Sequence, residues 1–253
     1  MSCMWIPRRS SLFVALALLL PLAPFVSQSD AATITVLAPA SAQAGLQPLA
    51  AQYAASTGTA VTLGGGSRAK VIDALKSGPA DVVVLPTRDM ADLPNVTGMT
   101  PLGRITVGVA VKAGAKVPDI STVEKFRAAL LAAKGVAFTD PAAGTSAGQV
   151  IDAMLAAPEF KGVKRVPVQG LAVTALASGT ADIALQMLPE LAHDKTVALA
   201  GPVPSAYGAG VDFSAGIASV TSDALQAEAF LTYLADPKNA ALWRQNGLEP
   251  LFH

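Results

Sequence analysis

The stretch AVTLGGGSRAKVIDALKSGPADVVVLP, residues 60–86, decides the fold of this chain. Its first part, AVTLGG, is apolar and β-branched and predicts a strand, and residues 67–76 predict a helix. ADVVVLP, residues 80–86, then predicts a buried strand. A strand, a helix and a strand joined by such short turns indicate a parallel sheet that is covered by helices.

The same alternation continues on both sides of this stretch. Upstream, residues 32–39 predict a strand and 43–56 a helix. Downstream, the predicted strands are ITVGVAVKAG, GVAFTDP, VKRVPV, ADIALQM and FSAGIAS, and the predicted helices cover 122–134, 150–157, 173–177, 223–235 and 237–246. Ser121 is predicted to cap the helix 122–134, because Glu124 follows it in the S-x-x-E pattern. We therefore predict an α/β fold.

The N-terminal residues predict an export signal. Arg8 and Arg9 precede the apolar run SLFVALALLLPLAPFV, and the small-residue segment SQSDAAT follows it. We expect residues 1–31 to be a signal peptide that is removed on export. The alternative is a membrane anchor, but Pro21 and Pro24 shorten the apolar run below the ~20 residues that a bilayer span needs.

Composition excludes several classes of function. The 18 Lys and Arg balance 18 Asp and Glu without a basic block, which argues against a nucleic-acid partner or a membrane-surface helix. The only cysteine, Cys3, lies in the predicted signal peptide, so the exported part has no thiol for catalysis or metal binding. The two histidines, His193 and His253, have no companion at ligand spacing. We therefore expect no metal and no cofactor.

Three predicted strand-to-helix turns carry hydroxyl side chains. The turns are APASAQAG with Ser41, LGGGSRAK with Ser67, and TDPAAGTSAGQ with Thr145 and Ser146. Ligands of open α/β sheets lie beyond the carboxyl ends of the strands, where helix N-termini offer free N–H groups and partial positive charge. We predict a pocket that binds a small anion through backbone N–H and hydroxyl groups rather than through positively charged side chains. Each hydroxyl taken alone is also an ordinary helix N-cap.

The order of motifs resembles a known family. ITVLAPAS, GGGSRAKVIDALKSGPADVVV, DPAAGTSAG, ALASGTADIAL and AEAFLTYLADPKNAALWRQNGLEP follow one another as in the periplasmic molybdate-binding proteins of ABC transporters, which are type II periplasmic binding proteins. The resemblance implies two lobes, 32–107 with 213–253 and 108–212, and a ligand cleft between them. It also implies a monomeric periplasmic receptor that binds a molybdate-type oxyanion and partners a membrane permease.

The resemblance also assigns ligand contacts. Ser41 and Ser67 match the two hydroxyl ligands of the family, and the loop with Thr145 and Ser146 forms the opposite wall. Backbone N–H groups near Ala147, Gln169 and Gly170 match its main-chain donors.

Two positions depart from the molybdate-binding pattern. At the end of the strand ADIALQM, where the family usually has a tyrosine, this chain has Met187, with Gln186 beside it as a candidate ligand. Arg68 stands where the family has an uncharged residue, and a guanidinium suits a carboxylate. An exposed first-turn side chain is the alternative for Arg68.

These departures resemble a branch that includes aconitate isomerase, whose activity is a proton shift in a tricarboxylate. A carboxylate receptor, an isomerase and a receptor-like protein without a strong ligand therefore stay open beside the oxyanion receptor. For an isomerase the candidate proton-transfer groups are Glu190, Asp140 and His193, with Arg68 and Arg104 as electrostatic clamps. No Ser-His-Asp arrangement is indicated, and we expect a binding protein rather than an enzyme.

Overall fold

The computed structural model describes residues 1–2 and 32–252. Every helix and strand of the described residues lies in one compact unit, which we call the second unit, Ala31–His253. The predicted signal peptide lies outside the described residues, apart from its first two positions. Within the described part of the chain, no helix is both long enough and apolar enough to cross a bilayer.

The first half of the second unit alternates strands and helices and then enters a long strand. Its elements are β1 (Thr33–Pro39), α1 (Ala40–Thr57), β2 (Ala60–Gly66), α2 (Arg68–Ser77), β3 (Val82–Pro86), α3 (Thr87–Met90) and β4 (Val96–Lys112).

The second half repeats the alternation, and the chain then returns to the first half. Its elements are α4 (Val123–Ala132), β5 (Val136–Thr139), α5 (Ser146–Leu155), β6 (Arg165–Val168), α6 (Val173–Ser178), β7 (Ile183–Met187), α7 (Leu188–Ala192), β8 (Val197–Pro202), β9 (Gly210–Ala218), α8 (Ala224–Leu234), α9 (Ala240–Gln245) and β10 (Leu248–Pro250). Short 3-10 helices lie at Pro141–Ala143, Pro158–Phe160, Ser205–Tyr207 and Pro237–Asn239.

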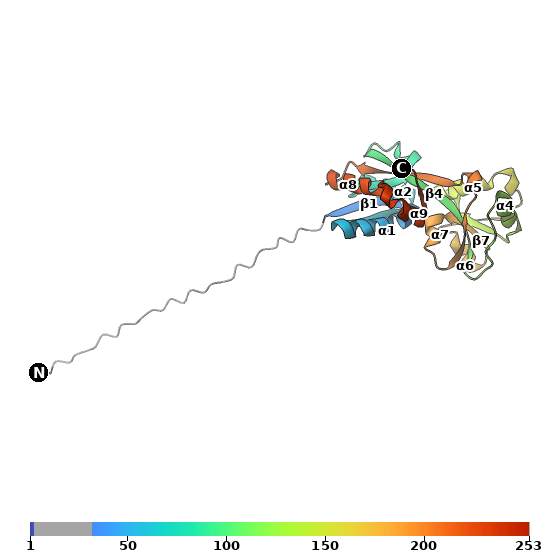
Figure 1. Ribbon diagram of the computed structural model, residues 1–253, viewed down its shortest axis with the longest axis horizontal. Coiled ribbons are helices and arrows are strands. Elements are labelled where there is room, and N and C mark those ends of the chain that lie inside the picture. The colour runs from blue at the N-terminus through green and yellow to red at the C-terminus, as the bar shows by residue number, and fades with distance from the viewer. Residues whose placement is uncertain (3–31, 253) are drawn as a thin grey trace. The chain divides into compact units, whose positions relative to one another are not determined.

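Strand β4 connects two groups of strands. Its residues from Val96 to Thr106 pair antiparallel with β9, those from Val107 to Ala110 with β7, and those from Gly108 to Lys112 with β8. Figure 1 shows β1, α1 and α8 toward one end of β4, and α5, α6 and β7 toward the other. The predicted lobe limits, 32–107 with 213–253 and 108–212, stay a prediction.

The two groups of strands share one plan. In the first, β1 lies between β2 and β3 and runs parallel to both; in the second, β5 lies between β6 and β7 in the same way. The sequence carries the repeat as well, because Ser-Gly-Pro-Ala-Asp ends at Asp81 before β3 and Ser-Gly-Thr-Ala-Asp ends at Asp182 before β7, 101 positions later. Two copies of a βαβαβα unit therefore face each other across β4.

The repeated aspartate ties neighbouring strands together in both copies. Asp81 Oδ2 accepts a hydrogen bond of 2.8 Å from the Thr35 N–H in β1, and its Oδ1 accepts one of 2.6 Å from the Thr221 hydroxyl. Asp182 accepts bonds of 3.1 Å and 3.2 Å from the N–H groups of Lys134 and Gly135, at the start of β5. Each carboxylate thus satisfies backbone donors where its sheet begins.

The parallel sheet predicted from the βαβ pattern is confirmed only within each copy. β4 and β9, which join the copies, pair antiparallel with their neighbours. The first part of β4 was not predicted, because residues 96–104 contain Gly98 and Pro101 and pair with two irregularities of register. The elements α3, α7, β8 and β10 were also missed, and each has six residues or fewer.

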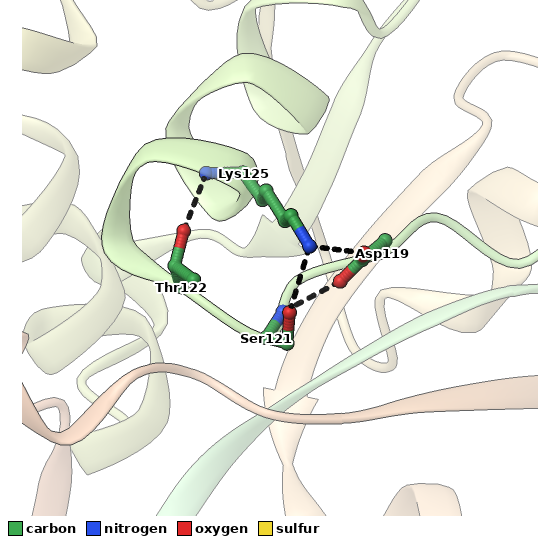
Figure 2. Close-up of polar contacts among 4 residues, drawn as sticks. All are labelled: Asp119, Ser121, Thr122 and Lys125. Carbon is green, nitrogen blue, oxygen red and sulfur yellow. Dashed lines mark hydrogen bonds and ion pairs between the residues drawn. The ribbon is translucent and has the colours of Figure 1, made fainter.

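The predicted cap of α4 is wrong by one residue. Figure 2 shows that Thr122, rather than Ser121, accepts the hydrogen bond from the Lys125 backbone N–H, over 3.2 Å. The Ser121 N–H instead donates to Asp119 over 3.0 Å, and the Lys125 ammonium bonds Asp119 over 2.7 Å. Asp119 therefore takes the N–H that the capping pattern assigned to Glu124, and the helix starts at Val123.

Replacing Asp81 with Ala is expected to destabilise the protein by about 2 to 6 kcal/mol. The substitution leaves the Thr35 N–H and the Thr221 hydroxyl without their acceptor, and each lost partner costs about 1–3 kcal/mol. Urea unfolding would measure the change in free energy. Asp73→Ala is the matched control, because the Asp73–Lys76 pair is exposed and should contribute less than about 1 kcal/mol. Equal unfolding midpoints for the two variants would contradict this role of Asp81.

Candidate functional site

A pocket of about 300 Å³ lies where the strands of both copies end. Pro39 and Gly66, which end β1 and β2, contribute from one copy, and Thr139, which ends β5, contributes from the other. The first residues of α1, α2 and α5 also line it. Three helix N-termini therefore bring unpaired N–H groups and partial positive charge to one space. This is an environment for an anion.

Hydroxyl groups add further donors to the pocket. Ser67 and Thr145 accept hydrogen bonds of 3.3 Å and 3.1 Å from the N–H groups of Lys70 and Gly148, so each is an N-cap. A capping hydroxyl uses a lone pair and keeps its proton, which it can still donate to a ligand. Ser41 and Ser146 also line the pocket, and their hydroxyls bond no other residue in the described part of the chain. The capping and binding interpretations are therefore compatible.

Two glycines allow the helices to approach the strand ends. A side chain at Gly65, which has a φ of +118°, would place its Cβ 2.5 Å from the Ala38 carbonyl oxygen. A Cβ at Gly148 would lie 2.7 Å from the Thr139 carbonyl oxygen. Any larger residue would push α2 or α5 away from the strand beside it. The small residues of these turns therefore bring backbone N–H groups close to the pocket.

Arg68 lines the pocket and carries positive charge into it. Its Nε lies 2.6 Å from the Oδ2 of Asp89 on α3, although the two groups are not aligned as a hydrogen bond. The Asp89 side chain is 9% exposed and that of Arg68 is 39% exposed. The ion pair with Asp89 involves the Nε of Arg68 and fixes the position of the guanidinium. The N–H groups on its two Nη atoms are then available to a ligand.

Glu190 also lines the pocket, although it was predicted only as a candidate proton-transfer group. Its Oε2 accepts a hydrogen bond of 3.2 Å from the Gln186 amide. Burial raises the pKa of the Glu190 carboxyl from its ordinary value of 4.5 to about 7, and the bond from Gln186 opposes that rise. No Lys, Arg or His among the described residues lies within ion-pair distance of it. The pocket thus contains a carboxyl group that is near its point of ionisation at neutral pH.

The predicted ligand residues divide into two groups. Those that line the pocket are Ser41, Ser67, Arg68, Thr145, Ser146, Ala147 and Gly170. Gln169 and Gln186 do not line it. The Gln169 amide donates to Asp140 over 2.9 Å, and the Gln186 side chain is 2% exposed and lies behind Glu190.

The other candidate proton-transfer and clamp residues lie elsewhere. The ring of His193 bonds the Pro189 carbonyl oxygen and Asn246. Arg104 forms a two-pronged ion pair with Asp212, over 2.7 Å and 3.0 Å. Neither Asp140, His193 nor Arg104 is part of the pocket lining. Glu190 is the only one of the three proposed proton-transfer groups that faces a ligand space.

A larger depression, of about 890 Å³, lies elsewhere on the unit, beside α4 and β10. Each charged residue of its lining has a partner: Asp119 bonds Lys125, which lies outside the lining, as Figure 2 shows, and Arg244 bonds Glu249 over 2.9 Å. Lys125 and Ser121 also hold the pKa of Asp119 below its ordinary range. The smaller pocket, which has free hydroxyls and an unpaired carboxyl, is the better candidate. In the part of the chain that is described, no three His, Cys, Asp or Glu residues are grouped to hold a metal.

Solved structures share this fold at low sequence identity. The periplasmic molybdate-binding protein of Azotobacter vinelandii matches with a TM-score of 0.64 and 20% identity, over 85% of this chain and 98% of that one. PEB3 of Campylobacter jejuni, solved with L-phospholactate bound, matches with a TM-score of 0.63 and 14% identity, over 85% of this chain and 99% of that one. The predicted two-lobe periplasmic binding protein fold is confirmed.

Sequence comparison finds a matching family model and a related protein. An aconitate isomerase from a Pseudomonas species is 27% identical over 249 residues, which cover 93% of this chain and 94% of that protein. The family model of bacterial extracellular solute-binding proteins matches residues 34–249. That match spans both copies of the repeated unit and all of the pocket residues. The chain belongs to the bacterial extracellular solute-binding protein family.

Proposed function

We propose that this protein is exported to the periplasm and binds a small organic carboxylate in the pocket between its two copies of the βαβαβα unit. The observation that carries the proposal is the pair of charged side chains in the pocket, Arg68 and Glu190. A guanidinium offers a carboxylate two parallel N–H donors. The volume of about 300 Å³ is at the small end of the range for small-molecule pockets.

Glu190 favours an extended carboxylate over a compact oxyanion. An ionised side chain in the pocket repels a dianion such as molybdate, and the low-dielectric surroundings strengthen that repulsion. A di- or tricarboxylate can place its charged groups at Arg68 and the helix N-termini while an uncharged carbon lies next to Glu190. The name of the characterised relative, aconitate isomerase, supports the same class of ligand.

A molybdate-type oxyanion receptor is the second candidate. The observation that favours it is the convergence of three helix N-termini with the hydroxyls of Ser41, Ser67, Thr145 and Ser146. These donors could surround a tetrahedral anion if Glu190 were protonated. In either case we propose that the protein acts as a monomer and delivers its ligand to a membrane permease.

A thermal-melting panel separates the two ligand classes. We expect cis- and trans-aconitate or citrate to raise the melting temperature, and molybdate, tungstate, sulfate and phosphate to leave it unchanged. At a ligand concentration of 100 times Kd the gain is about 2.7 kcal/mol, which corresponds to about 5 to 10 °C for a chain of this size. A shift with molybdate or tungstate alone would refute the carboxylate proposal.

Replacing Arg68 with Lys is expected to weaken carboxylate binding by about tenfold. Lysine keeps the charge but loses the two-pronged geometry of the guanidinium. Titration calorimetry with the carboxylate that gives the largest melting shift would measure Kd. Arg244→Lys is the matched control, because Arg244 also pairs with an acidic residue through its Nε but lies outside the pocket. An unchanged Kd in the Arg68→Lys variant would remove Arg68 from the binding site.

Anion binding is expected to weaken as pH rises through about 7. A bound anion disfavours the ionised form of Glu190 and raises its pKa further, so binding takes up a proton. Above the pKa of the free protein that proton must be supplied from solution, and Kd should rise by up to about tenfold per pH unit. Calorimetry at pH 6 and pH 8 would measure the difference. The Glu190→Gln variant should bind equally at both values, and a wild-type Kd that is the same at both would contradict this linkage.

A further inference from the structure

The internal repeat places two acidic residues at equivalent positions. Asp89 is the third residue of α3 and Glu190 is the third residue of α7, and they lie 101 positions apart, like the aspartates that precede β3 and β7. Asp89 is neutralised by Arg68 at 2.6 Å, with Arg88 at 3.8 Å. Glu190 has no such partner among residues 32–252. Of two related carboxylates, one is paired with a cation and the other is left free in the pocket.

A buried amide holds the free carboxylate in one orientation. Gln186 takes the place in β7 that Leu85 has in β3. Its Oε1 accepts a hydrogen bond of 2.8 Å from the Ala172 N–H, and this donor requires the Nε2 to point the other way, toward Glu190 Oε2 at 3.2 Å. The second carboxyl oxygen of Glu190 has no hydrogen-bond partner in the described unit. Gln186 is therefore a positioning residue, and that oxygen is available to a ligand.

We propose that Glu190 transfers a proton between two carbon atoms of the bound carboxylate, so that the protein is a proton-shift isomerase. This proposal rests on the carboxylate ligand proposed above. A substrate of the required class has a carbon–carbon double bond next to a methylene that also bears a carboxylate. The hydrogen atoms of such a methylene are acidic enough to be removed by a positioned carboxylate.

The step balances without an oxidant, a reductant or a cofactor. Glu190 takes a proton from the methylene carbon, and the electron pair of the broken C–H bond forms a new carbon–carbon double bond. The electron pair of the original double bond moves toward its far carbon and is shared with the carboxylate there. The protonated Glu190 then returns its proton to that far carbon, and a new C–H bond forms.

The pocket can stabilise the charge that develops during the step. The excess electron density lies on a substrate carboxylate, which the N-termini of α2 and α5 and the Arg68 guanidinium would face. Arg68 is also the only charged side chain besides Glu190 that the described residues bring to the pocket lining. The other nearby ionisable groups have partners of their own: Asp89 is ion-paired with Arg68, Asp140 accepts from Gln169, and His193 bonds Asn246. One group therefore has to act as both acid and base.

Proton transfer also requires the ionised form of Glu190 at the outset. Since burial raises its pKa to about 7 in the free protein and a bound anion raises it further, the rate at saturating substrate should increase with pH above 7. This trend is opposite to the expected trend in affinity. The two pH dependences therefore distinguish binding from catalysis by the same residue.

The test follows deuterium in the two aconitates by proton NMR. The purified protein is incubated in D2O with cis- or trans-aconitate, and both carbon-bound deuterium and conversion between the isomers are measured. We expect both in the wild-type protein. In the Glu190→Gln variant, both should fall by about 100-fold or more, while the aconitate-induced melting shift is retained. Glu228→Gln, on the exposed face of α8, is the matched control and should behave as wild type.

The outcomes separate the isomerase from the proposed ligand class. A melting shift with aconitate and no deuterium uptake in the wild-type protein would overturn the isomerase and leave the carboxylate receptor standing. Undiminished exchange in Glu190→Gln would overturn the role of Glu190. The absence of any melting shift with the carboxylates would instead refute the proposed function on which the isomerase depends.

Discussion

Backbone N–H groups that have no partner within their own helix shape the centre of this molecule. The first turn of every α-helix leaves such donors, and here α1, α2 and α5 all begin at the edge of one pocket. Gly65 and Gly148 allow this convergence, because any side chain there would meet a strand carbonyl oxygen. Ser67 and Thr145 each accept from one N–H of α2 and α5, and α1 has no side-chain cap, so further donors remain for a ligand. The backbone alone therefore forms an environment that favours an anion, even without the charged side chains.

The two copies of the repeated unit contribute different charged groups to this anion-binding pocket. Both copies carry an aspartate that ties the strands and an acid on the following short helix. In the first copy the acid is neutralised by Arg68, which is 39% exposed and borders the pocket. In the second copy Gln186 stands where the first copy has Leu85, and no Lys, Arg or His of residues 32–252 pairs with the acid. The pocket is asymmetric as a result, with a positive group on one wall and an ionisable one on the other.

Much of this could be predicted from the sequence, since the helices and strands have strong periodicity and the turns carry Ser, Thr and Gly. Seven of the predicted ligand residues line the pocket for that reason. Glu190 was predicted as a candidate proton-transfer group but not as a ligand residue, and nothing in the sequence indicated the five-residue helix α7 that carries it. Gln186 was expected in the pocket because it neighbours Met187, which takes the place of the tyrosine in the molybdate-binding family. It is instead buried behind Glu190, where its Oε1 accepts from the Ala172 N–H and its Nε2 donates to the Glu190 carboxyl.

A protein of this kind has to release what it binds, whether to a permease or as a product. The pocket walls come from both copies, so a movement of one copy relative to the other would open or close it. Across them, Arg88 on α3 donates a hydrogen bond of 2.9 Å to Gln149 on α5. The Arg88 side chain is 58% exposed, and a bond made in such contact with water contributes little, about 1 kcal/mol.

Hydrogen bonds from the pocket donors to a ligand should contribute more free energy than the exposed Arg88–Gln149 bond, because a ligand in the pocket is shielded from water. Ligand binding should therefore determine whether the copies are closed, and the contacts between the copies should matter less. Once the ligand is closed in, the same shielding strengthens the effect of its charge on Glu190. A change that excludes more water from the closed pocket should therefore raise the pKa of Glu190, which makes it a stronger base. The same change should strengthen the repulsion between ionised Glu190 and a bound anion.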